Sequence, residues 1–196
     1  MTLSRLLVLT DRAQLPANRT LPETVAACVQ GGATHVVMRE LDLSVEARAE
    51  LAAGLTGIPG VVLITARTWF RGAGAMHLSA VQPTADADEA SFYGSSCHDE
   101  ADVRRAVAAG ASYVTVSPVA PSDSKPGYGP PLAVPGVRRL ARVADGTPVF
   151  ALGGVGLGNA HSFRAAGAYG VAVMGALMRS DDPVTLTKHL LAAVGR

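Results

Sequence analysis

The chain has 196 residues, a length that suits one domain or two very small ones. Hydrophobic residues make up 48% of it and charged residues 17%, which is typical of a soluble globular protein. The net charge is +1 and the basic residues are scattered, so the sequence argues against nucleic-acid binding. The two cysteines, Cys28 and Cys97, allow neither a disulfide framework nor a zinc-type cluster.

The N-terminal apolar run is short, and Asp11 and Arg12 follow it with no small-residue cleavage site. We interpret it as a first strand and not as a signal peptide. No apolar run in the sequence is long and uninterrupted enough to span a membrane. We therefore expect a cytoplasmic protein without a membrane partner.

Apolar runs recur roughly every 25 residues, the size of one βα unit. The predicted strands are Arg5–Asp11, His35–Glu40, Val61–Thr65, Ala75–Ser79, Phe92–His98, Tyr113–Val119, Pro148–Gly153 and Gly170–Met174. The predicted helices are Leu21–Gln30, Ser44–Leu55, Asp99–Ala109, Val137–Val143, Ala160–Ala166 and Pro183–Val194. The segments after the third and fourth strands are short, so any helices there should be brief. The long connection Pro118–Pro135 is typical of a functional lid.

Glycine recurs at the predicted helix ends, just before a strand, where a left-handed C′ residue is needed. The four pairs are Gly32-Ala33, Gly74-Ala75, Gly110-Ala111 and Gly167-Ala168. Strands that are apolar at nearly every position indicate a parallel sheet covered on both sides. Eight such strands with alternating helices predict a single (β/α)8 barrel over residues 1–196. A doubly wound open sheet is the alternative, although no G-x-G-x-x-G follows the first strand.

Two late strands end in glycine just before a helical stretch, at Gly153-Gly154 and at Met174-Gly175. In parallel barrels the loops after strands seven and eight form a phosphate site with a short helix N-terminus. Backbone N–H groups at these glycines can converge on one phosphate. The alternative is that the glycines only serve tight turns.

Polar side chains gather at the predicted carboxyl ends of the strands, where a barrel keeps its site. They are Asp11, Arg39, Glu40, Thr65, Arg67, His77, Ser79, Ser96, His98, Ser117, Ser122, Ser124 and Lys125. Several cations and two imidazoles suit an anionic small molecule, and we expect a phosphate ligand.

Three of these side chains are candidates for direct roles. His98 can titrate near neutral pH and transfer a proton, or it can be an ordinary rim histidine. Lys125 can close over a phosphate or be a solvated loop lysine. Arg39, at a buried strand end, needs an anionic partner, which is either Glu40 or a ligand. His77 is the less promising histidine and is expected to face a neighbouring loop.

Seven short motifs in order resemble the thiamine-phosphate synthase and TenI family over nearly the whole chain. They are L-T-D (9–11), M-R-E (38–40), H-L (77–78), S-x-H (96–98), S-K-P-G (124–127), L-G-G-V (152–155) and A-V-M-G-A (172–176). The resemblance implies a compact (β/α)8 barrel that binds thiazole phosphates. Its synthases join hydroxymethylpyrimidine diphosphate to thiazole phosphate with Mg²⁺, whereas its TenI branch aromatises a thiazole carboxylate phosphate by tautomerisation.

The synthase pattern is incomplete here. Synthases of the family carry Gln-x-Arg-x-Lys on strand two, Asn-Asp after strand three and Asp after strand four. The matching positions are Val37, Arg39, Leu41, Thr65, Ala66 and Gln82. Only the arginine is kept, and Mg²⁺ prefers carboxylate ligands. Asp86 or Asp88 could replace the lost ones, and Ser122, Ser124 and Lys125 resemble the diphosphate loop.

The sequence therefore favours the TenI-like branch, with no metal or other cofactor. His98 matches the branch's proton-transfer histidine. The predicted substrate-binding residues are Arg39, Thr65, Arg67, Ser96, Ser122, Ser124, Lys125, Gly154, Met174 and Gly175. A Mg²⁺-dependent synthase and a non-catalytic sensor of a phosphorylated ligand are the alternatives. A homo-oligomer is left open.

Overall fold

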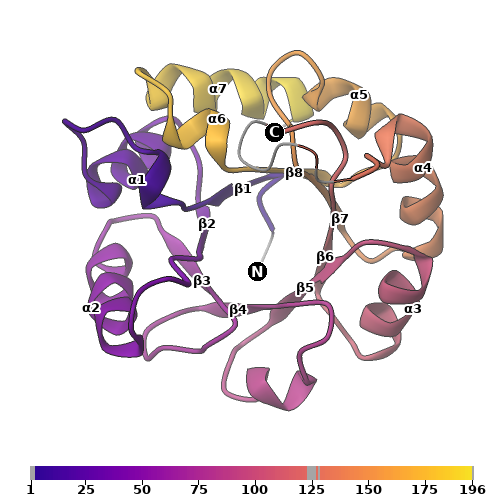
Figure 1. Cartoon of the computed structure of the whole chain (residues 1–196), viewed down its shortest axis with the longest axis horizontal. Coiled ribbons are helices and arrows are strands. Elements are labelled where there is room, and N and C mark those ends of the chain that lie inside the picture. The colour runs from indigo at the N-terminus through magenta and orange to yellow at the C-terminus, as the bar shows by residue number, and fades with distance from the viewer. Residues whose placement is uncertain (1–2, 123–126, 128, 196) are drawn as a thin grey trace.

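The computed structural model describes residues 3–122, 127 and 129–195. Eight parallel strands pair in sequence order and close when β8 pairs with β1 (Figure 1). The strands are β1 (Leu6–Leu9), β2 (His35–Met38), β3 (Val62–Ala66), β4 (Ala75–Leu78), β5 (Tyr93–Cys97), β6 (Tyr113–Val116), β7 (Val149–Leu152) and β8 (Gly170–Val173). The predicted (β/α)8 barrel is confirmed, and the open sheet is excluded.

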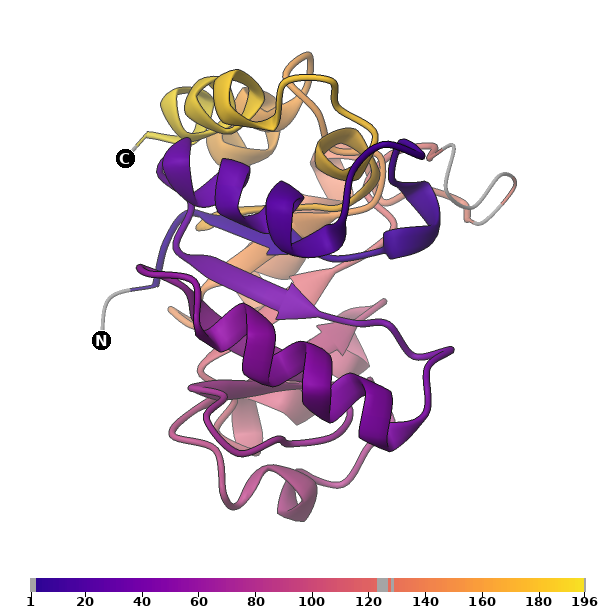
Figure 2. The same cartoon turned by 90° about the vertical axis from the view of Figure 1, so that its left-hand side faces the viewer.

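Helices surround the ring of strands on its outside, and Figure 2 shows α1 and α2 lying along it. The α-helices are α1 (Leu21–Gln30), α2 (Val45–Thr56), α3 (Glu100–Ala108), α4 (Ala133–Val143), α5 (Ala160–Ala165), α6 (Gly175–Met178) and α7 (Pro183–Val194). The 3-10 helices are η1 (Arg12–Gln14) and η2 (Thr84–Ala87). None of the helices in the described residues has the length and apolarity needed to cross a membrane.

The predicted helices are confirmed with small changes at their ends. α4 begins at Ala133, earlier than the predicted Val137, because Pro135 lies in its first turn, where no intrahelical N–H is required. η1 and α6 were not predicted as separate elements. As expected, the connections after β3 and β4 are poor in helix: only η2 lies there, and residues 67–74 contain none.

Glycines end several helices as predicted. Gly32, Gly110 and Gly167 adopt φ values of 103°, 83° and 103°, which favour glycine because it has no Cβ. Gly74 was wrongly placed at a helix end. It follows an irregular turn, and its N–H donates to the Leu63 carbonyl at 2.9 Å.

Side chains alternate along each strand between the barrel interior and the helices. The outer faces pack with the helices in one large cluster that includes Val36, Val114 and Val171. The interior holds a smaller cluster that includes the fully buried Tyr113 and Phe150. This packing closes the middle of the barrel, and the open space lies at the carboxyl ends of the strands.

Candidate active site

A cavity of about 330 Å³ opens at the carboxyl ends of the strands, where enzymes of this architecture keep their active sites. Its polar or charged lining residues are Arg39, Arg67, His77, Ser79, Ser96, His98, Ser117 and Ser122. Its apolar walls include Leu9, Val37, Leu41 and Ala66. Within the described residues no carboxylate lines this cavity. The site is therefore cationic, with one apolar side.

The structure brings most of the predicted site residues together. Arg39, Arg67, Ser96, His98, Ser122 and Met174 line this cavity. Gly154 and Gly175 line an adjoining cavity of about 260 Å³, which shares Ser122, Gly153 and Met174 with the first. Ser124 and Lys125 lie outside the described residues.

Thr65 is the one described member of the predicted set that lines neither cavity. Strand alternation explains its place. Ile64 belongs to the barrel interior and Ala66 lines the cavity, so Thr65 between them points toward the helices and is fully buried. Ala66, the last residue of β3, lines the cavity in its place.

His98 is held at the end of β5 in a defined tautomer. Its Nδ1 lies 2.9 Å from the Ser117 carbonyl oxygen, and its backbone N–H donates to the Asp102 carboxylate at 2.9 Å. A carbonyl oxygen only accepts, so Nδ1 carries the proton in the neutral ring. Nε2 is then left with its lone pair for a ligand. His98 is exposed at the mouth and can act as a base there.

Two arginines supply the positive charge of the cavity. Arg39 is half-buried, and its Nη1 lies 2.8 Å from the Met174 sulfur across the mouth, a weak acceptor for a guanidinium. Arg67 has a left-handed backbone, with φ of 65°. Burial lowers the pKa of the neighbouring Arg48, and the charge of Arg67 lowers it further. These arginines form a cationic region beside β2 and β3.

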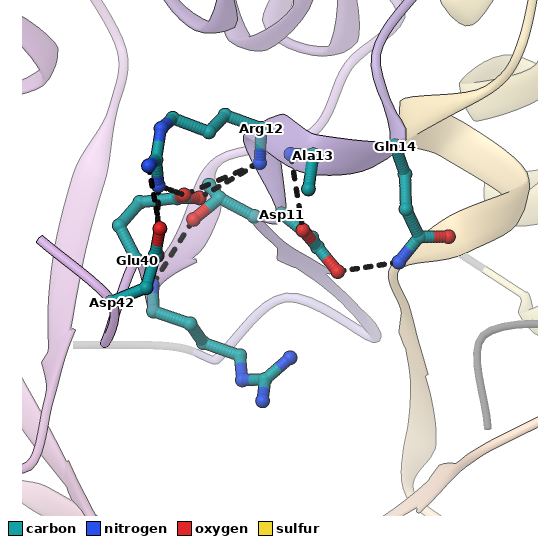
Figure 3. Close-up of polar contacts among 8 residues, drawn as sticks. Asp11, Arg12, Ala13, Gln14, Glu40 and Asp42 are labelled. Carbon is teal, nitrogen blue, oxygen red and sulfur yellow. Dashed lines mark hydrogen bonds and ion pairs between the residues drawn. The ribbon is translucent and has the colours of Figure 1, made fainter.

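Glu40, one of the two partners considered for Arg39, pairs instead with Arg12 (Figure 3). Its buried carboxylate accepts from the Arg12 backbone N–H at 3.2 Å and from Nη1 at 3.1 Å. Arg12 also binds Asp42, and these hydrogen bonds to Asp42 and Glu40 raise its pKa. The φ of Glu40 is 30°, a strained conformation that these bonds hold in place. Both carboxylates near the end of β2 are thus engaged by Arg12, and Arg39 keeps its charge for the cavity.

The glycines after β7 allow a close approach of the chain that follows β6. Gly154 has φ of 67°, and a Cβ there would lie 2.2 Å from the Pro121 carbonyl oxygen. Gly154 therefore does serve a tight turn, which was the alternative considered for these glycines. Across the smaller cavity, α6 begins at Gly175. The N–H groups of Leu177 and Met178 donate to the Met174 carbonyl at 3.0 Å, whereas those of Gly175 and Ala176 precede the first hydrogen bond of the helix. Turn formation and anion binding are compatible at this position.

His77 was expected to face a neighbouring loop, and that prediction was wrong. It lies in the barrel interior with 8% exposure, and its ring contacts Tyr113 and Ser96. Burial and then the charge of Arg39 lower its pKa to about 4. The available signal was parity, because His77 shares the face of Ala75, one of the interior residues.

A barrel of this kind, with a cationic pocket at its carboxyl mouth, is the architecture of enzymes that act on small anionic molecules. The family model described as "Thiamine monophosphate synthase" matches residues 6–177, and the chain belongs to this family.

Relatives and a solved structure agree with this assignment. The thiamine-phosphate synthase of Roseiflexus castenholzii is 34% identical over 197 residues, 93% of this chain and 85% of the relative. That of Halorhodospira halophila is 33% identical over 185 residues, 88% of each chain. The thiamine phosphate pyrophosphorylase of Pyrococcus furiosus has the same fold, with a TM-score of 0.82, 24% identity and coverage of 97% of this chain and 95% of that one.

The residues present do not fit the Mg²⁺ ion that the resemblance to synthases implies. Within the described part of the chain, no three His, Cys, Asp or Glu side chains are grouped to hold a metal. Ala66 offers no side-chain ligand atom at the end of β3, and its carbonyl accepts from Arg48. The Gln82 amide N–H donates to Asp86 at 2.8 Å. The candidate replacement Asp86 is thus engaged in this hydrogen bond, and neither it nor Asp88 lines the cavity.

Proposed function

We propose that this chain is a TenI-like tautomerase that acts on a phosphorylated five-membered ring with a carboxylate, of the thiazole carboxylate phosphate type. The observation that carries the proposal is the fixed tautomer of His98, whose Nε2 is left as an acceptor at a cavity with two arginines and no described carboxylate. The reaction moves one proton between two atoms of the ring. It therefore needs an acid/base group and anion anchors.

The two adjoining cavities suit the two parts of such a ligand, its phosphate and its ring. The smaller one, with Gly154 and Gly175, suits the phosphate, because backbone N–H groups at such a turn and helix start attract anions. The larger one suits the ring, and it shares Met174 with the smaller one. A single ligand can span both.

Arg39 suits the ring carboxylate. It reaches the cavity from β2, and the thioether of Met174 is a poor substitute for an anion. The apolar walls beside it, Val37 and Leu41, suit the uncharged face of a ring. His98 Nε2 takes the proton from one ring atom and, as the imidazolium, gives it back at the other.

Replacement of His98 tests the proposal. We expect His98→Ala to lower kcat for tautomerisation about a hundredfold or more, with a small change in KM, because proton transfer is lost and the anion anchors remain. His161→Ala, which removes an exposed histidine of α5, is the matched control and should keep full activity. Full activity in His98→Ala would remove His98 from the mechanism.

A Mg²⁺-dependent synthase is the second candidate, and the names of the relatives favour it. Incubation with hydroxymethylpyrimidine diphosphate and thiazole phosphate, with and without Mg²⁺, separates the two. Metal-dependent formation of thiamine phosphate would replace the tautomerase proposal. Calorimetric binding of thiazole phosphate without turnover of any thiazole substrate would instead indicate the sensor.

A further inference from the structure

A buried chain of hydrogen bonds runs from the barrel interior to the cavity. The Tyr113 hydroxyl on β6 lies 3.0 Å from His77 Nδ1 on β4, and His77 Nε2 lies 3.0 Å from Ser96 Oγ on β5. Tyr113 is fully buried, and its ring stacks on His77 with centroids 5.5 Å apart. Ser96 lines the cavity. The direction of each bond in this chain decides what Ser96 offers to a ligand.

Tyr113 sets the first direction. Within the described residues, His77 is the one hydrogen-bond partner of its hydroxyl. Burial raises the pKa of Tyr113, so the hydroxyl keeps its proton. If Nδ1 donated instead, the buried O–H of Tyr113 would have no acceptor, which disfavours that arrangement roughly tenfold or more. Tyr113 therefore donates to His77 Nδ1.

His77 sets the second direction. Its ring is neutral at physiological pH because burial and the charge of Arg39 lower its pKa to about 4. With Nδ1 accepting, the single ring proton lies on Nε2, which donates to Ser96 Oγ. The Thr115 hydroxyl, 3.5 Å from Nε2, is too distant for more than a minor share of this bond. The hydroxyl proton of Ser96 is then left for the cavity.

We propose that Tyr113 and His77 are positioning residues that make Ser96 a hydrogen-bond donor into the cavity. The site thus selects a ligand atom with a lone pair, such as a ring nitrogen or a carboxylate oxygen, opposite Ser96. His98, the residue after β5, has the reverse tautomer, so β5 and its end present a donor at Ser96 and an acceptor two positions later. The identity of the ligand rests on the proposed function, whereas the direction of the hydrogen bonds does not.

The tautomers can be measured in the ligand-free protein by long-range ¹H–¹⁵N correlation NMR near neutral pH. We expect His77 to show a protonated Nε2 and a bare Nδ1, and the neutral form of His98 to show the opposite pattern. Loss of a signal set in His77→Gln assigns it. A protonated Nδ1 on His77 would overturn the inference.

Removal of the Tyr113 hydroxyl tests the consequence for a ligand. Tyr113→Phe should mix the two tautomers of His77 and lower kcat about tenfold, with KM within about twofold. Tyr169→Phe is the matched control, because the hydroxyl of this tyrosine donates to the Leu3 carbonyl and not to a member of the Tyr113–His77–Ser96 hydrogen-bond chain. Loss of the Tyr169 hydroxyl should leave the His77 tautomer and the kinetics unchanged. A Tyr113→Phe protein with unaltered His77 tautomer would contradict the inference.

The two proposals fail separately. A protein without tautomerase activity that shows the expected tautomers would refute the proposed function and support the hydrogen-bond chain. An active tautomerase with the opposite His77 tautomer would refute the chain alone.

Discussion

The buried imidazole of His77 makes a prediction about the stability of the fold at acid pH. Its ring lies in the barrel interior between Tyr113 and Ser96, with no carboxylate among its hydrogen-bond partners in the described residues. Protonation would place a charge in this interior near Arg39, which is why its pKa is lowered. His77→Gln replaces the ring with an uncharged amide that can still bond to its neighbours. Residue 77 therefore cannot bind a proton in the variant.

The sign and size follow from the two protonation states. In the unfolded chain the imidazole has its ordinary pKa of 6.5, and in the folded protein the pKa is about 4. Above pH 6.5 the ring is neutral in both states and contributes no pH dependence. Between pH 6.5 and 4 the unfolded chain binds a proton that the folded protein does not. The free energy of unfolding therefore falls by about 1.4 kcal/mol for each unit by which the pH is lowered. The whole loss is about 3 kcal/mol, of which about 2 kcal/mol is reached near pH 5.

Urea unfolding of wild type and His77→Gln at pH about 7.5 and about 5 measures this effect. The stability difference between the two proteins should change by about 2 kcal/mol in favour of the variant as the pH falls. Burial also lowers the pKa of His35, but that residue is present in both proteins and cancels. Parallel pH dependences for wild type and His77→Gln would refute the reasoning.

Two further substitutions test how the mouth is built. Gly154→Ala should cost about 2 kcal/mol or more in urea unfolding, because of its positive φ and the contact with the Pro121 carbonyl, whereas Gly156→Ala, with open space around it, should cost little. Glu40→Ala should cost about 2 kcal/mol, because the Arg12 groups that it accepts from lose a buried partner. Asp42→Ala, which removes an exposed carboxylate, should cost much less, and equal losses in these two variants would contradict the role of Glu40.

The barrel could be predicted because its signals are local. Each strand is a short apolar run, and glycines such as Gly32, Gly110 and Gly167 end helices through their own backbone conformation. Gly74 carries the same Gly-Ala sequence without a helix before it. A repeat in the sequence therefore identifies the unit, but it does not show that each copy keeps every element.

The candidate site could be predicted in outline, because parallel strands bring their carboxyl ends to one mouth. A place at a strand end did not by itself indicate which face a side chain takes. One position of register separates Thr65, which points toward the helices, from Ala66 at the cavity. His77 was underestimated for a different reason: its importance depends on Tyr113 and Ser96, which come from other strands.

The distribution of charge at the mouth connects these observations to the chemistry. Arg12 forms ion pairs with both Glu40 and Asp42, the carboxylates near the end of β2. The cavity is lined by Arg39 and Arg67, and within the described residues no carboxylate lines it. A diphosphate bound through a divalent cation needs acidic ligands on the protein side as well. A monophosphate with a carboxylate needs cations and backbone N–H groups alone, and those are the groups that this mouth provides.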